Sequence, residues 1–196
     1  MEQKRWMTRT GQWAFALVGL VLSASAMALA PNSAMLADAC TGCHGTYGAS
    51  AGMSMPSLAG QSRQVIVEAM KNFKSGERYS TVMGRLAKGY TDADFAAMGD
   101  YFAGQKLHIT QQMLDQQRVA KGAVLHNAKC KSCHPDNGKT NEDDAPPVAS
   151  QWLPYLQMQM ALYIEGKRKT TKMSDVVKGL SADDLESLLQ FYASVK

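Results

Sequence analysis

All four cysteines of the chain lie in two short motifs of the same form. They are Cys40-Thr41-Gly42-Cys43-His44 and Cys130-Lys131-Ser132-Cys133-His134. Both read C-x-x-C-H, the c-type heme attachment motif. The two thiols of each motif add across the two vinyl groups of one porphyrin, and the adjoining histidine is then held under the iron as an axial ligand. The sequence therefore predicts two covalently bound hemes c.

Other uses of paired cysteines explain these motifs less well. A zinc site has its two C-x-x-C pairs about 15–20 residues apart and needs no histidine after each pair. One redox-active C-x-x-C is typical of thioredoxin-like proteins, but two copies with a trailing histidine are not. Structural disulfides leave both histidines unexplained. Heme attachment accounts for every cysteine and for both histidines.

The two motifs belong to a repeat that covers most of the chain. Cys40 and Cys130 are 90 residues apart, and residues at this offset match without a gap over about 75 residues. The matching segments are 58–61 with 148–151, 89–95 with 179–185 and 101–103 with 191–193, together with single residues such as Gly76 with Gly166 and Arg78 with Arg168. The sequence is therefore interpreted as a tandem duplication.

The repeat selects candidates for the second axial ligand, which should recur in both halves. Among 13 methionines, two pairs recur: Met70 with Met160, and Met83 with Met173. Met70 lies in a segment with helical apolar spacing, which favours a role in the core. Met83 and Met173 each follow the first heme cysteine of their half by 43 residues. We expect each to lie in a loop over its heme and to bind the iron. Thioether ligation raises the reduction potential and leaves no open site for a substrate, which indicates electron transfer.

Two further histidines make bis-histidine ligation the alternative. His126 falls opposite Leu36 at the repeat offset, and His108 lies at the junction between the halves, so neither recurs. Both are interpreted as ordinary surface or helix residues.

A proline follows each motif histidine at the same distance. Pro56 and Pro146 lie 12 residues after His44 and His134. A backbone carbonyl there is able to accept the Nδ1 hydrogen of the ligating imidazole and fix its orientation. Pro147 is an alternative to Pro146, and a plain loop role is the alternative for both prolines.

The expected fold is all-α, with three main helices in each half. They are residues 33–39, 64–76 and 92–105, and residues 118–129, 155–166 and 182–194. Thr91 and Ser181 are predicted N-caps, with acidic residues in the first turn that suit the helix dipole. The predicted domains are residues 31–106 and 118–196, joined by a linker of residues 107–117.

Residues 1–30 read as a signal peptide. Lys4, Arg5 and Arg9 precede an apolar run, and Ala28-Leu29-Ala30 fits an A-x-A cleavage site. The apolar run is too short to span a membrane comfortably, and no later segment reaches that length. Removal of the leader leaves 18 basic and 16 acidic residues. This near-neutral balance gives no case for nucleic-acid binding. The expected location is the periplasm.

The motifs resemble those of a known family. Each half resembles a class I cytochrome c domain, and the tandem is similar to the cytochrome c4 group. Segments 40–58, 73–90 and 92–101 resemble the diheme subunit of flavocytochrome c sulfide dehydrogenase, above all the string 73–85, FKSGERYSTVMGR. The resemblance implies that Met83 is the axial ligand of the first heme and that the Pro56 carbonyl supports His44. It matches Met173 less distinctively, because residues 167–172 depart from the family pattern.

The resemblance also implies a partner. In that family a separate FAD chain oxidises sulfide and passes electrons to the diheme subunit. The present sequence holds no G-x-G-x-x-G motif, so we expect it to be no enzyme by itself. The alternative is a free cytochrome c4-type carrier that delivers electrons to a terminal oxidase. A diheme peroxidase or a thiosulfate-oxidising cytochrome is disfavoured, because no cysteine is spare and each iron has a methionine.

Overall fold

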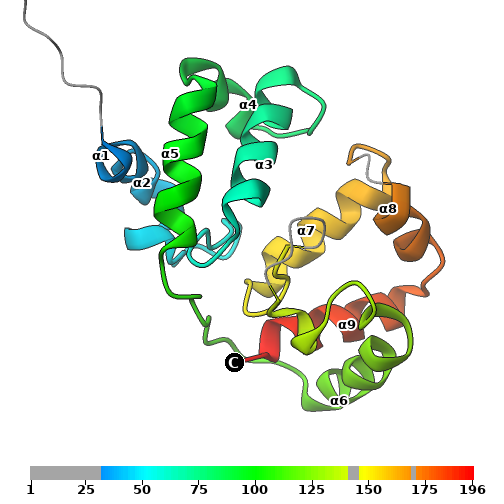
Figure 1. Cartoon of the computed structure of the whole chain (residues 1–196). Helices are drawn as coiled ribbons and strands as arrows, with labels where there is room; N and C mark the ends of the chain where they lie inside the picture. The colour runs from blue at the N-terminus through cyan, green and yellow to red at the C-terminus, as the bar shows by residue number, and fades with distance from the viewer. Residues whose placement is uncertain (1–31, 141–145, 169–170) are drawn as a thin grey trace, which may run out of the picture. The chain divides into compact units, whose positions relative to one another are not determined.

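Helices make up the regular secondary structure of residues 32–140, 146–168 and 171–196, which are the residues that the computed structural model describes (Figure 1). No strand occurs in this part of the chain, as the all-α expectation requires. None of its helices is long and apolar enough to cross a membrane. The predicted leader, residues 1–30, lies outside the described residues.

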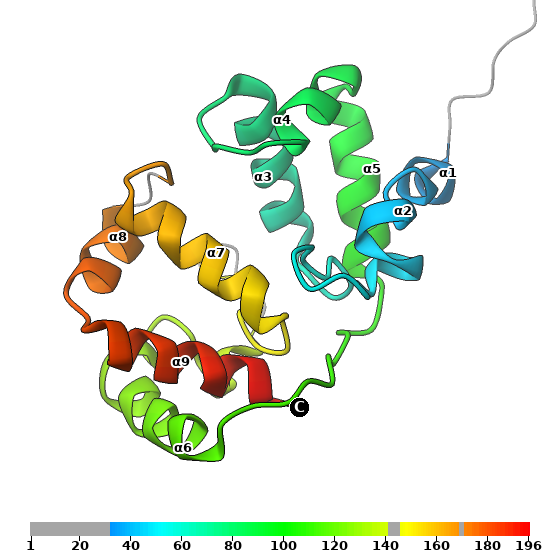
Figure 2. The same ribbon diagram turned by 180° about the vertical axis from the view of Figure 1, so that it is seen from behind.

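The described part of the first half contains two long helices, α3 and α5, and three short ones. The α-helices are α1 (Ser33–Asp38), α2 (Thr41–His44), α3 (Arg63–Ser75), α4 (Met83–Leu86) and α5 (Asp92–Ala103), with 3₁₀ turns at Thr46–Gly48 and Ala87–Gly89. α3 and α5 lie side by side in both views (Figures 1 and 2).

The second half repeats this order. Its α-helices are α6 (Gln116–Leu125), α7 (Leu153–Ile164), α8 (Thr171–Lys178) and α9 (Ala182–Ser194), with a π-helical turn at His126–Cys130 and a 3₁₀ turn at Asp136–Gly138. α6 packs along α9 (Figure 2). α6 begins two residues before the predicted helix start, because Asp115 caps it by accepting from the backbone N–H groups of Gln117 and Arg118.

Side-chain caps fix the starts of the last helices, as predicted. Thr91 and Asp94 form a capping box at α5, in which each side chain accepts from the backbone N–H of the other residue. Ser181 accepts from the Asp184 N–H at 3.1 Å at the start of α9. These caps satisfy N–H groups that have no partner within the helix.

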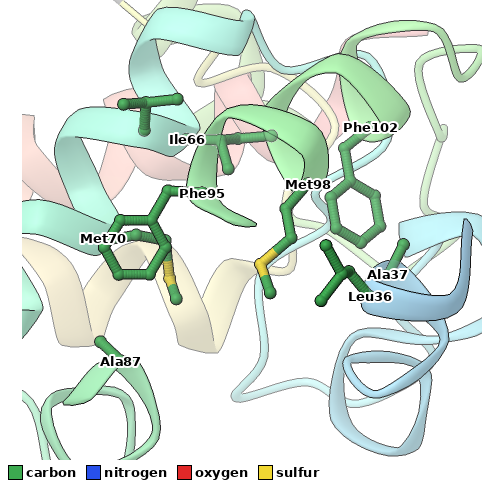
Figure 3. Packing of buried hydrophobic residues seen from close by; sticks show 9 residues of the cluster. Leu36, Ala37, Ile66, Met70, Ala87, Phe95, Met98 and Phe102 are labelled. Atoms are coloured by element: carbon green, nitrogen blue, oxygen red, sulfur yellow. The ribbon is translucent and has the colours of Figure 1, made fainter. Parts of the chain in front are cut away.

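Each half has its own hydrophobic core. In the first half the core lies between α1, α3 and α5 and contains Phe95, Met98 and Phe102, each at most 2% exposed (Figure 3). The core of the second half is built from α9 and from Leu156 of α7. Neither core takes a residue from the other half, which is how a tandem of two domains is expected to pack.

The backbone repeats the duplication at the same offset of 90 residues. Left-handed conformations recur in four pairs, namely Tyr47 and Asn137, Gly48 and Gly138, Gly60 and Ser150, Gly76 and Gly166. Equivalent hydrogen bonds recur as well. Gly60 N–H donates to the Phe102 carbonyl, and Ser150 N–H donates to the Tyr192 carbonyl. Ser150 adopts φ 59° although it has a Cβ, a conformation that a non-glycine residue rarely takes.

Candidate functional site

Both C-x-x-C-H motifs form a single tight turn. The His44 N–H donates to the Cys40 carbonyl at 2.9 Å, and the His134 N–H donates to the Cys130 carbonyl at the same distance. An α-helical turn of this kind places the two cysteines and the histidine of a motif on neighbouring positions of one short surface. Both motifs thus share this closing hydrogen bond, although only the first forms a helix, α2, and the second is a turn that follows the π-helical turn His126–Cys130.

The four cysteines are unpaired thiols. Cys40 and Cys130 are half-buried, while Cys43 and Cys133 are exposed. Burial raises the pKa of the Cys40 thiol, and the neighbouring Cys43 raises that pKa further. Burial likewise raises the pKa of Cys130. Each motif therefore offers two thiols, one facing the protein and one facing outward.

A hydrogen bond at Nδ1 orients the His44 side chain. Its side chain is buried, and its Nδ1 hydrogen is donated to the Pro56 carbonyl at 2.9 Å. Burial lowers the pKa of His44, so the imidazole is neutral near pH 7. With Nδ1 engaged, Nε2 carries the free lone pair, which is the arrangement of a metal-binding histidine oriented by a backbone carbonyl.

His134 has different surroundings. It is half-buried, and its ring centroid lies 6.4 Å from that of Tyr192. Burial lowers the pKa of His134, and the charge of His126 lowers it further. Within the described residues, no hydrogen bond joins His134 to Pro146, which directly follows the undescribed segment 141–145. The role predicted for Pro146 stays a prediction.

The predicted methionines lie on helices rather than in open loops. Met83 is the first residue of α4, is half-buried and packs against the same core as Cys40. Met173 is half-buried on α8. Met70 is buried in the first core, as the sequence predicts (Figure 3). The ligand roles of Met83 and Met173 stay predictions.

A buried histidine, His126, lies next to the second motif. His126 is 0% exposed, its Nδ1 lies 3.0 Å from the Tyr192 hydroxyl, and its Nε2 has no hydrogen-bond partner. The sequence left a surface or a helix role open for His126; the surface role is wrong, because His126 is buried in the π-helical turn His126–Cys130. The signal was present at the repeat offset, because the matching residue Leu36 belongs to an apolar, inward-facing helix position.

The donor set fits heme c at both motifs. Each motif supplies two free thiols and a neutral histidine, and the Nδ1 of His44 is already occupied by a backbone carbonyl. Thioether attachment needs the thiols, and axial ligation needs the neutral imidazole. Two such sites on a duplicated helical fold define a diheme c-type cytochrome.

Comparison with known proteins agrees with this class. Cytochrome c4 of Pseudomonas aeruginosa is 29% identical over 168 residues, which cover 79% of this chain and 83% of that protein. The cytochrome subunit of sulfide dehydrogenase of Chlorobaculum tepidum is 47% identical over 68 residues, which cover 35% of this chain and 61% of that protein. The crystal structure of reduced cytochrome c4 from Pseudomonas stutzeri superposes with a TM-score of 0.75 at 25% identity, covering 85% of this chain and all of that chain. No family model matches the chain.

The chain is thus similar, in sequence and in structure, to diheme electron-carrying cytochromes, among them cytochrome c4 and the cytochrome subunit of sulfide dehydrogenase. Its fold is that of two class I cytochrome c domains in tandem, and its cofactors are two covalently bound hemes c.

Proposed function

We propose that this chain is a periplasmic electron-transfer subunit that receives electrons from the FAD subunit of a sulfide dehydrogenase and passes them to a downstream acceptor. The observation that carries the proposal is the similarity to the cytochrome subunit of sulfide dehydrogenase, at 47% identity over 68 residues. The similarity to cytochrome c4 is more extensive but weaker, at 29% identity.

The residues have distinct roles in this proposal. Cys40 and Cys43 bind the first heme covalently, and His44 and Met83 are its axial ligands. Cys130, Cys133, His134 and Met173 have the same roles at the second heme. The Pro56 carbonyl orients His44 by accepting its Nδ1 hydrogen, and Pro146 is the candidate for the same task at His134.

The hemes supply one-electron redox chemistry, and the protein supplies their axial ligands and their covalent attachment. Two protein ligands at each iron leave no place for a substrate, so the chain conducts electrons and the partner performs the catalysis. Covalent attachment keeps each heme on a domain of modest size. The buried, neutral state of His44 keeps its Nε2 available at neutral pH.

Purification from the native periplasm tests the partner. The expected result is flavin absorption beneath the heme bands, in stoichiometric amount, that travels with a second, larger chain. The purified complex should reduce its hemes when sulfide is added. Heme bands from a lone small protein would contradict the subunit role.

The second candidate is a free diheme carrier of the cytochrome c4 type that delivers electrons to a terminal oxidase. The full-length coverage of a cytochrome c4 structure at a TM-score of 0.75 favours it. Recovery of the lone protein, together with its oxidation by membranes that contain a terminal oxidase, is the result expected of this carrier.

A further inference from the structure

A pair of buried hydrogen bonds joins the second half to the loop behind the first heme site. The Ser57 N–H donates to Gln151 Oε1 at 2.9 Å, and Gln151 Nε2 donates to the Ser57 carbonyl at 3.1 Å. Ser57 is 1% exposed and Gln151 is 4% exposed. The amide of Gln151 therefore pairs with the backbone of Ser57 on both sides, away from water.

The Ser57 N–H belongs to the same peptide group as the Pro56 carbonyl, which accepts the Nδ1 hydrogen of His44 at 2.9 Å. A continuous chain of hydrogen bonds thus runs from His44 through this peptide to Gln151. Each bond in such a chain polarises the next, by about 10–30% per bond, and the effect is greatest where water is excluded. A peptide that donates its N–H carries more negative charge on its carbonyl oxygen and accepts more strongly.

We propose that Gln151 is a positioning residue for the first heme, through which the second half of the chain lowers the reduction potential of the heme in the first half. The proposal rests on His44 being an axial ligand of that heme. A stronger Nδ1–H···O=C bond makes the imidazole a better electron donor, and a better donor stabilises ferric iron.

In the second half, the peptide that corresponds to Pro56–Ser57 lacks the N–H that this contact requires. At the repeat offset Ser57 corresponds to Pro147, which has no backbone N–H. The peptide between Pro146 and Pro147 therefore has no hydrogen to donate, whatever lies beside it. Gln151 therefore acts on the first heme site alone, and the first half makes no corresponding contact with the Pro146–Pro147 peptide.

The structure holds Gln151 firmly in place. Its backbone carbonyl accepts from Gln112 Nε2 at 3.0 Å, and Gln112 Oε1 accepts from the Leu153 N–H at 2.9 Å. The next residue, Trp152, donates its Nε1 hydrogen to the Ser50 carbonyl in the first half at 2.9 Å. Trp152 thus joins the same loop, but at a peptide that does not touch His44.

The Gln151→Leu variant tests the proposal, with Trp152→Phe as its control. Both variants remove contacts between the halves, but only Gln151→Leu removes the acceptor behind Pro56. In the diheme holoprotein we expect the Gln151→Leu change to raise the potential of the first heme alone. The expected size is a two- to fivefold change in its reduced-to-oxidised ratio, or about 20–40 mV for one electron. Trp152→Phe should leave both potentials unchanged.

Ser57→Pro provides an independent test from the other side of the contact. It copies Pro147 of the second half and removes the N–H, whereas the control Ser57→Ala keeps the N–H and removes only the hydroxyl that accepts from the Ser50 N–H. Ser57→Pro should shift the first heme as Gln151→Leu does, Ser57→Ala should not, and the double variant should show no further shift.

NMR of the reduced protein with ¹⁵N-labelled histidine gives a readout that does not depend on the potential. The His44 Nδ1–H should exchange faster with solvent in Gln151→Leu and in Ser57→Pro. Unchanged potential and exchange in both variants, with intact low-spin spectra, would overturn the role of Gln151 while leaving the ligand assignment in place. An equal shift at both hemes would also overturn it. If His44 of the unmodified protein lacks the large ring-current shift of a heme ligand, the assignment of the site itself fails.

Discussion

The two motif histidines share a local sequence pattern and differ in their neighbours. His44 is buried and donates to Pro56, whereas His134 is half-buried and lies near Tyr192 and within the electrostatic influence of His126. Because ligand basicity and burial both tune a heme, the two hemes of this chain are expected to differ in potential. The duplication copied the predicted ligands without copying the residues that surround them.

Replacement of Met83 by alanine tests its role as a ligand. The thioether stabilises ferrous iron, so its loss should lower the potential of one heme and remove about half of the far-red absorption that methionine-ligated ferric heme contributes. Redox titration and the visible spectrum measure both effects.

The control is Met70→Leu. Met70 is buried in the first core, and exchange of Met for Leu there conserves volume and should cost less than about 1.5 kcal/mol. The visible spectrum of the Met70→Leu variant should be the same as that of the unmodified protein. Full retention of the far-red band in Met83→Ala would rule out Met83 as a ligand.

In the second half, the backbones of α6 and α9 approach each other closely at Gly122. A Cβ added at Gly122 would lie 2.1 Å from the Ser187 carbonyl oxygen and 2.6 Å from the Phe191 Cβ. Only glycine lets the two backbones come this near. Ion pairs at the start of α9 add to the contact, where Lys121 and Arg118 reach Asp183 on the exposed side.

Gly122→Ala should therefore force the two helices apart. Overpacking of this kind costs about 1–3 kcal/mol of unfolding free energy, which exceeds the gain from the better helix propensity of alanine. Thermal unfolding followed by circular dichroism measures the loss. Gly89→Ala is the matched control, because a Cβ at Gly89 meets no atom within 4 Å. A Gly122→Ala protein that unfolds at or above the original temperature would contradict the argument.

On the scale of the whole molecule, residues 110–115 of the segment between the halves bind to the second half. Thr110 Oγ1 donates to the Ser150 carbonyl at 2.6 Å, and the Asp115 N–H donates to Gln190 Oε1 at 3.1 Å. The last residue of the first core is Phe102, and the half-buried residues that pack around this core, such as Tyr101, also belong to the first half. The hydrophobic core of each half is thus made of residues of that half.

A fragment of residues 1–106, produced with the segment 1–30 predicted to be its leader, should fold and hold one heme. A domain of this size is marginal by burial alone, and the covalent heme supplies the missing apolar contacts. Circular dichroism should show helices, and the heme content should be one per chain. Since the fragment lacks Gln151, its heme should titrate at the potential of the first heme in Gln151→Leu. A fragment that retains no covalent heme would contradict the independence of the halves.

The sequence alone determined the features that depend on local spacing. The C-x-x-C-H motifs predict which residues meet one porphyrin, because the two cysteines and the histidine of each motif lie within one turn. The helix starts at Thr91 and Ser181 follow from capping side chains three residues away from their partners. The offset of 90 residues revealed the duplication, and residues 73–85 carried the resemblance to the diheme subunit of flavocytochrome c sulfide dehydrogenase.

The tertiary structure decided the contacts between residues distant in the chain. Gln151 meets Ser57 across 94 positions, and no local pattern marks either residue as half of a pair. The burial of His126 depends on α9 covering it, and the need for glycine at Gly122 depends on how closely α6 and α9 approach. Such contacts depend on which surfaces come together when the chain folds, whereas motifs and caps depend on residues that are close in the sequence. That is why the sequence indicates the chemistry of both sites, and only the fold distinguishes one site from the other.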